Sequence, residues 1–354
     1  MGIRFEFFEA GCGDSILVST DEGTNILIDG GVASTYEDAI TYSLDTLNGD
    51  LDLVVVTHID TDHICGIIEL LNDKYRRNMI KDFWFNTASE NMLIMGQDTN
   101  EIGGGHGNLL SYFIRSRDIS HKNNIYLKEN ISDNIFPIGK DIKLTLLSPT
   151  QKALKELRDT WNENDILKKC QGGSVQIGGY KYPEDRREID DLYTSYKNKK
   201  IKFGKKDTYT NNSSIAFILS YKNKNFLFLG DSDINDINIS LKDLGYSEKK
   251  DEQLEVGFVK LSHHGSKKNI NDEFLSLIKS DTFVTLTDGS HPNNSKYKHP
   301  DKESYTLILN HSKRARTINL FFNYSQPIDK KFPRDMDERV QYHFQTNKIN
   351  TLRF

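Results

Sequence analysis

The chain has 354 residues, of which 27% are charged and 36% apolar. This composition is typical of a globular protein with a substantial core. Its 46 basic and 51 acidic residues give a net charge of −5, which argues against a generally basic nucleic-acid-binding protein. No apolar run reaches the roughly 18 residues of a membrane span, and the N-terminal residues lack the apolar stretch of a signal peptide. Three widely spaced cysteines do not form a disulfide framework. We therefore expect a cytoplasmic protein without a membrane partner.

Strand and helix patterns alternate through the first third of the chain. Residues 53–57 form a continuous β-branched run, which is typical of a strand buried on both faces. Short turns that contain glycine separate the earlier segments and predict antiparallel pairing. The expected strands are residues 3–8, 15–19, 25–29, 53–57 and 82–86, and the expected helices are residues 36–47 and 64–72.

The pattern weakens between about residues 87 and 140 and then returns. Further strands are expected at 142–148, 214–220, 225–230, 257–262, 282–287 and 317–322, with helices at 108–115, 151–161, 272–278 and 302–311. Residues 162–210 are polar and lysine-rich, and we interpret them as an insertion in a single domain that spans residues 1–354. The pattern of several strands followed by a helix occurs twice along the chain. It predicts two sheets between layers of helices.

The segment Thr57-His58-Ile59-Asp60-Thr61-Asp62-His63 places four metal-binding side chains directly after the buried strand. Charged groups at the end of a buried strand need a compensating cation or partner. Imidazole and carboxylate groups together are suited to zinc, manganese, iron or cobalt. A helix cap by Asp62 explains one of the four residues and leaves the other three without a role.

Two later strands end in the same kind of residue. The strand at 225–230 is followed by Asp231, and the strand at 257–262 is followed by His263 and His264. Taken alone, Asp231 fits a turn and the two histidines fit a surface pair. Beside the first motif, we expect these side chains to join it at one edge of the sheets.

Together these residues resemble the metallo-β-lactamase fold superfamily. The likeness is greatest to the branch that contains the metallo-hydrolase domain of the competence DNA-uptake channel protein. Residues 87–210 have no counterpart in that branch. The likeness rests on segments in the same order, namely Gly11-Cys12-Gly13-Asp14-Ser15, Ile28-Asp29-Gly30-Gly31, residues 57–66, Asn211-Asn212-Ser213-Ser214, Leu229-Gly230-Asp231, residues 261–266, His299-Pro300 and Phe322-Asn323-Tyr324.

The resemblance implies an α/β fold, a four-layer αββα sandwich with two divalent metal ions at the edge of both sheets. The implied ligands are His58 and Asp60 for the first ion, Asp62, His63 and His264 (or His263) for the second, and Asp231 for both. Asp60 stands where the commonest motif of the superfamily has histidine. Zinc is the first choice, and the harder carboxylate ligand keeps manganese and iron open.

The third histidine of the first ion in this superfamily has no obvious counterpart. His106 is the best candidate, because the glycines around it allow a close approach of the backbone, although a loop histidine without a role fits equally well. A hydroxide held between two metal ions is the expected nucleophile, with Asp62 or Asp231 orienting it. His299 is the candidate donor to the leaving group, or else an ordinary residue before Pro300.

Candidate substrate-binding residues are less specific. Asn212 and Ser213 precede a strand that reaches the same edge, and they fit either a phosphoryl contact or a turn. Lys199, Lys200 and Lys202 belong to a lysine run interleaved with aromatic residues. Such a run suits nucleic acid, and it also suits a solvated loop.

These observations favour a metal-dependent phosphodiesterase or nuclease that acts on DNA or RNA. A bacterial antiviral defence system with a protein partner is one setting that fits such an enzyme. The alternatives are a small-molecule hydrolase, such as a cyclic-nucleotide phosphodiesterase, a phosphorylcholine esterase or a lactonase, and a non-catalytic regulatory partner. The fold by itself does not decide among these substrates.

Overall fold

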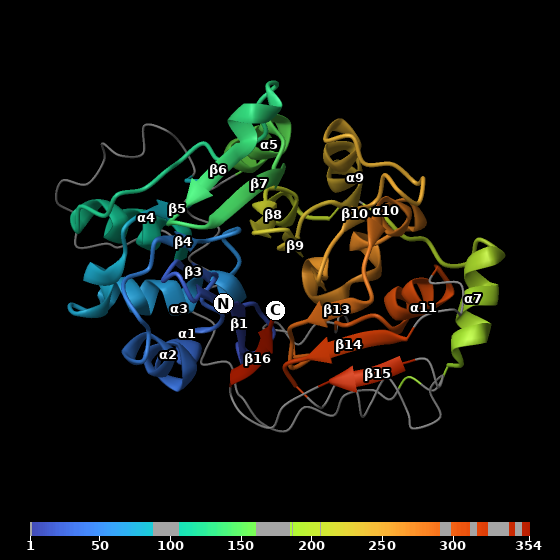
Figure 1. The fold of residues 1–354 in the computed structure, drawn as a ribbon, viewed down its shortest axis with the longest axis horizontal. Helices are drawn as coiled ribbons and strands as arrows, with labels where there is room; N and C mark the ends of the chain where they lie inside the picture. Colours follow the sequence, from blue (N-terminus) through green and yellow to red (C-terminus); the bar gives the residue numbers. More distant parts are fainter. Residues whose placement is uncertain are drawn as a thin grey trace.

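The structure is a computed structural model that describes residues 2–87, 106–160, 185, 187–205, 207–290, 299–311, 317–324, 340–343 and 349–354. Within these residues two large β-sheets pack face to face, and helices cover their outer faces (Figure 1). This arrangement confirms the predicted four-layer αββα sandwich. Among the same residues, no helix is long and apolar enough to cross a membrane.

The first sheet combines an antiparallel meander with a parallel part. Strands β1, β2 and β3 pair antiparallel, as the glycine turns predict, whereas β3, β4 and β5 run parallel. The C-terminal strand β16 pairs with β1 and forms the edge, which the sequence did not predict. In spatial order the strands are β16 (Ile349–Arg353), β1 (Ile3–Phe8), β2 (Ile16–Thr20), β3 (Asn25–Ile28), β4 (Leu53–Val55) and β5 (Phe83–Trp84).

The second sheet is also mixed. Its strands β6 to β9 pair antiparallel, and β9, β11, β13, β14 and β15 run parallel. A short separate pair joins β10 (Leu254–Glu255) to β12 (Ile278–Lys279). In spatial order the strands are β15 (Val340–His343), β14 (Ile318–Phe322), β13 (Thr282–Thr285), β11 (Val259–Lys260), β9 (Lys224–Phe228), β8 (Ala216–Tyr221), β7 (Ile142–Ser148) and β6 (Ile135–Ile138).

Three buried clusters correspond to the three interfaces between the four layers. The middle cluster lies between the sheets and is rich in aromatic rings, such as Phe5, Phe226 and Phe258. One outer cluster joins the first sheet to the π-helical residues Tyr36–Ile40, α2 (Thr41–Asp45), α3 (Thr61–Asn72) and α4 (His106–Ser116), and α1 (Ala33–Thr35) precedes them and contacts α3. The other outer cluster joins the second sheet to α9 (Ile234–Asp243), α10 (Asp272–Leu277) and α11 (Lys302–His311). Helices α5 (Gln151–Thr160) and α8 (Tyr209–Asn212) contact each other near the start of β8.

The part of the predicted insertion that the structure describes is folded against the body of the protein. Residues 187–205 include α7 (Ile189–Lys197), which packs on α11. Leu192 is buried, and Tyr196 and Phe203 contact the outer cluster of the second sheet. Residues 162–184, 186 and 206 of the insertion lie outside the described residues.

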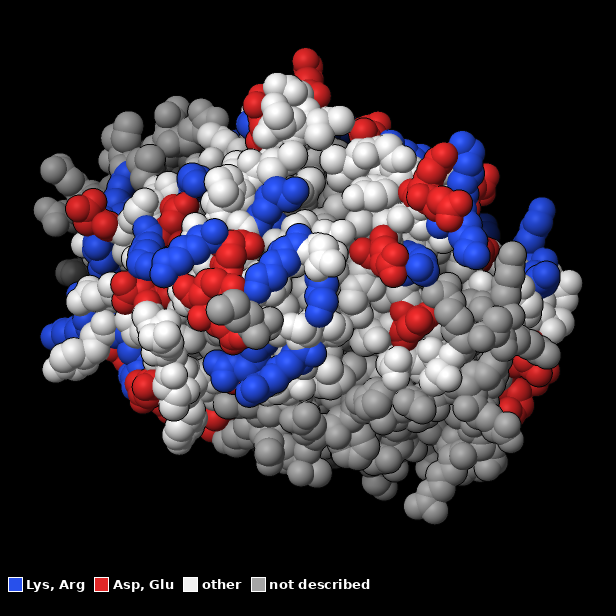
Figure 2. Space-filling view, viewed as in Figure 1, with Lys and Arg blue, Asp and Glu red and all other residues white. Residues whose placement is uncertain are grey.

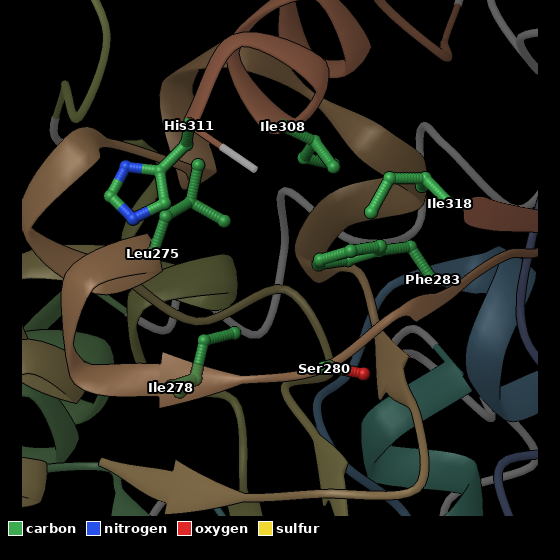
Figure 3. A pocket seen from close by; sticks show the side chains of 7 residues that line it. All are labelled: Leu275, Ile278, Ser280, Phe283, Ile308, His311 and Ile318. Carbon is green, nitrogen blue, oxygen red and sulfur yellow. The ribbon is translucent and has the colours of Figure 1, made fainter. Parts of the chain in front are cut away.

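Two hollows in the described part of the chain lie apart from the predicted metal ligands. One is a cavity of about 20 Å³ that is lined mainly by apolar side chains between α10, α11 and the second sheet (Figure 3). The other is an open groove of about 580 Å³ along residues 122–136. Neither contains a side chain of the predicted metal site.

Candidate metal centre

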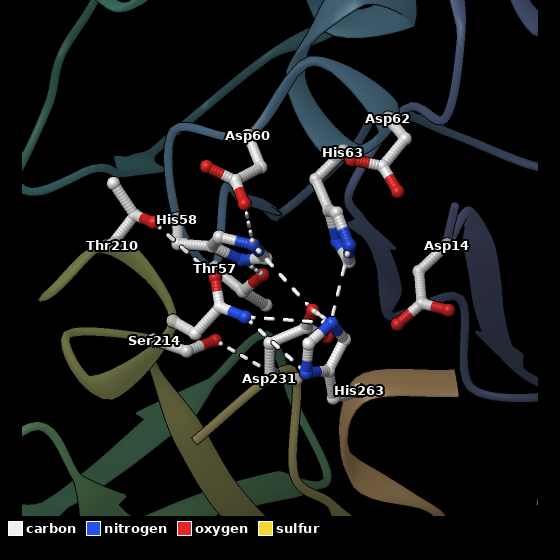
Figure 4. Close-up of polar contacts among 12 residues, drawn as sticks. Asp14, Thr57, His58, Asp60, Asp62, His63, Thr210, Ser214, Asp231 and His263 are labelled. Atoms are coloured by element: carbon white, nitrogen blue, oxygen red, sulfur yellow. Dashed lines mark hydrogen bonds and ion pairs between the residues drawn. The ribbon is translucent and has the colours of Figure 1, made fainter. Parts of the chain in front are cut away.

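The parallel strands of both sheets deliver the predicted ligands to a common edge. Asp29 follows β3, and His58 follows β4, which is its parallel neighbour. On the second sheet, Asp231 follows β9, and His263 follows the parallel neighbour β11. Because the carboxyl ends of parallel strands lie at the same edge of a sheet, the side chains after them meet there. Figure 4 shows His58, Asp231 and His263 converging from both sheets.

Asp231 lies at the centre of the cluster and is surrounded by imidazole rings. Its Oδ2 atom is 3.8 Å from the Nε2 atom of His58, of His263 and of His264. Its Oδ1 atom is 3.7 Å from Nε2 of His63. The two carboxylate oxygens therefore face different histidines, which is the arrangement that a bridging ligand requires.

Two sets of donors can be distinguished around Asp231. In the first set, Nε2 of His58 lies 3.8 Å from Oδ2 of Asp60. In the second set, Nε2 of His264 lies 3.6 Å from Oδ2 of Asp62 and 3.4 Å from Nε2 of His63. The structure thus brings together the six predicted ligands, with His264 in the second set.

The buried donors fit divalent metal ions. Donor atoms on one zinc ion are about 3–4 Å apart, because each bond is about 2.0–2.2 Å long. The N–O separations of 3.7 to 3.8 Å around Asp231 fall in this range and are too long for hydrogen bonds. Among the described residues, Nε2 of His58 and Oδ1 of Asp231 have no hydrogen-bond partner although both are buried. Imidazole and carboxylate groups are ligands for zinc, manganese or iron.

The charges of the cluster also favour cations. Burial by itself lowers the pKa of His63, but the carboxylates of Asp231 and Asp29 outweigh it and raise that pKa to about 9. The pKa of His264 is likewise raised, against the effect of burial, mainly by Asp231. Burial raises the pKa of Asp231, yet the surrounding imidazoles dominate and hold it well below its ordinary value. The site therefore attracts positive charge strongly.

Asp29 fixes the orientation of His63 and of the loop after β4. Its Oδ1 atom accepts a hydrogen bond of 2.7 Å from the backbone N–H of Thr57, and its Oδ2 atom accepts one of 2.7 Å from the Thr57 hydroxyl. The same Oδ2 atom lies 2.9 Å from Nδ1 of His63. A proton on Nδ1 leaves the lone pair of Nε2 free for a metal ion, so Asp29 supports His63 as a ligand.

Glycines allow the close approach of backbone on which this geometry depends. A Cβ atom on Gly66 would lie 2.0 Å from the carbonyl oxygen of Gly30, and one on Gly13 would lie 1.6 Å from that of Asp62. Helix α3 is therefore held directly against the turn after β3, where the N–H of Gly30 donates to the carbonyl of His63.

The loop after β11 has an unusual backbone. His263 and His264 have φ angles of 47° and 53°, and Gly265 follows with 84°. Non-glycine residues rarely adopt this left-handed conformation, which costs about 1–2 kcal/mol for each residue. This backbone conformation directs both imidazole rings toward Asp231.

Several neighbouring residues were not predicted from the sequence. Asp14 forms a buried ion pair with Lys260, and its Oδ1 atom lies 3.3 Å from Nδ1 of His264. Burial opposes ionisation of Asp14, but Lys260 and His264 outweigh it and lower its pKa. Asp207 lies 2.7 Å from Nδ1 of His263. For the Asp14–Lys260 pair, the sequence did contain a signal, namely a lysine inside the buried strand β11. The polar segment around Asp207 contains no comparable signal.

The remaining predicted residues lie at various distances from the cluster. The ring of His299 packs on that of His263, with 4.6 Å between centroids, and burial lowers its pKa to about 4. Asn212 and Ser213 donate to the carbonyls of Asp207 and Thr210, within their own loop.

Two neighbours of that loop contact the site instead. The Ser214 hydroxyl accepts a bond of 3.0 Å from the N–H of Asp231, and the Asn211 amide nitrogen lies 3.3 Å from Nδ1 of His263. Lys199, Lys200 and Lys202 are exposed. His106 begins α4, and its side chain lies outside the described part of the structure.

Comparison with known proteins agrees with this geometry. A sequence model of the metallo-beta-lactamase superfamily matches residues 11–74, which contain Asp29 and the whole motif of residues 58–63. No curated protein matches the sequence. The matched segment is therefore similar in sequence to that superfamily, and it contains the loop from which residues 58–63 reach the cluster.

Solved structures with a similar course of the chain share little sequence with it. The metallo-beta-lactamase fold protein YhfI from Bacillus subtilis has 9% identity and a TM-score of 0.40, covering 99% of both chains. A diphosphatase of the PhnP family has 10% identity and a TM-score of 0.42, covering 99% of this chain and 98% of its own. The human short-form tRNase Z has 10% identity and a TM-score of 0.39 with the same coverage. Likeness at this level says nothing about the substrate of this chain.

Proposed function

We propose that the protein is a metal-dependent phosphodiesterase that cleaves nucleic acid at the edge where the two sheets meet. The observation that carries this proposal is the group of four imidazoles around the buried carboxylate of Asp231, at N–O distances of 3.7 to 3.8 Å. When bound there, a pair of divalent ions stabilises developing negative charge and lowers the pKa of a coordinated water. The likeness to the competence-protein branch remains part of this proposal.

Different residues of the site have different proposed roles. His58, Asp60 and Asp231 would hold the first ion, and Asp62, His63, His264 and Asp231 the second. Asp29 and the Leu286 carbonyl orient the rings of His63 and His264 through their Nδ1 atoms. Because burial lowers the pKa of His299 to about 4, its ring is neutral near pH 7 and carries a single N–H group. His299 is therefore better suited to donate a hydrogen bond than to transfer a proton to the leaving group.

A nucleic-acid substrate is favoured by the position of the lysine-rich segment. Figure 2 shows basic and acidic groups interleaved on one face of the molecule, so a polyanion would need a local basic element. Exposed Lys199, Lys200 and Lys202 precede Asp207, which contacts His263 at the cluster. The lysine-rich segment is thus held at both ends. Asp207, which follows it, contacts the candidate site, and α7, which precedes it, packs on α11.

A hydrolysis screen tests the proposal. The purified protein, supplied in turn with zinc, manganese and iron(II), would be incubated with plasmid, single-stranded DNA, RNA, bis(p-nitrophenyl) phosphate and a lactone. We expect cleavage of a polynucleotide and its loss in Asp231→Asn. The matched control is Asp233→Asn, because Asp233 caps α9 two residues away and asparagine caps a helix equally well. Cleavage of the small phosphodiester or the lactone alone would instead identify a small-molecule hydrolase.

Charge reversal at Lys199, Lys200 and Lys202 tests the substrate contact separately. Each lysine that engages a phosphate contributes about 0.7–0.9 to the slope of log affinity against log salt, so three should change it by roughly 2–3. A matched reversal of the exposed Lys74, Lys249 and Lys250 should not change the slope beyond the general effect of net charge. Equal slopes for the two triple variants would remove the role of this segment.

A further inference from the structure

All four imidazoles around Asp231 share one arrangement. In each ring, Nε2 lies 3.7 or 3.8 Å from a carboxylate oxygen of Asp231. In each ring, Nδ1 lies close to a different oxygen atom. These contacts are His58 with the Thr57 hydroxyl at 3.0 Å, His63 with Asp29 at 2.9 Å, His264 with the Leu286 carbonyl at 2.9 Å and His263 with Asp207 at 2.7 Å.

This pattern is the usual environment of a metal-binding histidine. Such a histidine nearly always directs one ring nitrogen to a carboxylate or carbonyl oxygen, which leaves the other nitrogen for the ion. His58, His63 and His264 belong to the donor sets already described. His263 has the same arrangement, although the superfamily pattern needs only one of the two adjacent histidines.

The first donor set contains fewer side chains than the second. It contains His58, Asp60 and Asp231, whereas the second set contains Asp231 and three other side chains. The Oδ2 atom of Asp231 faces His58, His263 and His264 at 3.8 Å each. With 19% of its side chain exposed, His263 lies on the open side of the cluster, next to His299.

Resting on the proposed function, we infer that His263 binds the first metal ion through Nε2 and that Asp207 is the carboxylate that orients its ring. The two adjacent histidines then serve different ions, His263 the first and His264 the second. The left-handed backbone at both residues makes this possible, because it turns two consecutive side chains to the same side. Asp207 also ties the lysine-rich segment to the metal centre.

Metal binding to the intact protein tests the inference without any activity measurement. The apoprotein would be titrated with zinc by calorimetry and with cobalt(II) by visible absorption, and bound metal would be counted after desalting. We expect about two ions for the wild type and about one for His263→Asn. Asparagine is chosen because it tolerates the left-handed backbone. Asp207→Asn should weaken the first ion about 10–100-fold and leave the second unchanged. Asp191→Asn, on the exposed side of α7, is the matched control.

The competing ligand is His106, so His106→Ala is measured in parallel and should retain about two ions. Thermal unfolding of each apoprotein shows whether it is folded. If folded His263→Asn still binds two ions with wild-type affinity, the inference is wrong, while the proposed function stands on the wild-type result. If the wild type binds no ion, the inference and the proposed function both fail. A selective effect of Asp207→Asn supports the inference even where His263→Asn does not fold, and the lack of that effect overturns it.

Discussion

Replacing Asp29 by asparagine should weaken the second metal ion while leaving the fold intact. Asparagine has the same shape and tolerates the φ angle of 55° at this position. However, an NH₂ group in the place of Oδ2 cannot accept from Nδ1 of His63, which lies 2.9 Å away. The neutral ring would then carry its proton on Nε2, where the ion binds. We expect a loss of about 10–100-fold in affinity for the second ion.

The effect on stability can be separated from the effect on binding. The Thr57 hydroxyl can rotate to another acceptor, and the backbone N–H of Thr57 still donates to Oδ1 of residue 29. The free energy of unfolding of the apoprotein should therefore fall by only about 1–3 kcal/mol. Asp52→Asn is the matched control, because Asp52 accepts a bond of 2.9 Å from the N–H of Asn25 on the same sheet, with no contact to the cluster. Calorimetric titration with zinc and urea unfolding measure both quantities. Wild-type metal affinity in Asp29→Asn would refute this account of how His63 is oriented.

Two further substitutions test the packing and the rim of the site. Gly66→Ala should destabilise the protein by about 3 kcal/mol or more in urea unfolding, since its Cβ would lie 2.0 Å from the Gly30 carbonyl oxygen. Gly23→Ala has open space around the added Cβ atom but a φ angle of 87°, so it should cost only the left-handed strain of about 1–2 kcal/mol, and equal losses would contradict the packing argument. His299→Ala should keep both ions and lower kcat/KM about 10–100-fold, because a hydrogen bond to a charged group contributes about 1.5–3 kcal/mol. Loss of metal in that variant would instead make His299 a ligand.

The sequence predicted most of the sandwich because its strands carry strong local patterns. The continuous apolar run after residue 53 and the alternating β1 both fold as expected. Helix α9 was missed because asparagines dilute its pattern, although Ile234, Ile237 and Leu241 do face the core. Strand β16 was missed because its partner β1 lies at the other end of the chain, and pairing over such a separation has no local signal.

The candidate site was predictable to the extent that it lies at strand ends. Parallel pairing places the residues after β3, β4, β9 and β11 together, so a motif search that considers strand ends finds the donors. Spacing gives no information about backbone angles, and it therefore could not tell whether one or both of His263 and His264 turn inward. Spacing also could not find Asp207, because its contact with His263 joins two distant parts of the sequence.

Three residues of the site have a backbone conformation that local preference does not predict. Asp29, His263 and His264 all have left-handed φ angles, of 55°, 47° and 53°. Strain of this kind, about 1–3 kcal/mol at each residue, persists only where the surroundings determine the conformation. Here the surroundings are the direct contact of Gly30 with Gly66 behind Asp29, and the parallel strands on both sides of β11. Packing in the core thus offsets the backbone strain at these three residues. The strained conformation in turn directs their side chains toward the cluster around Asp231.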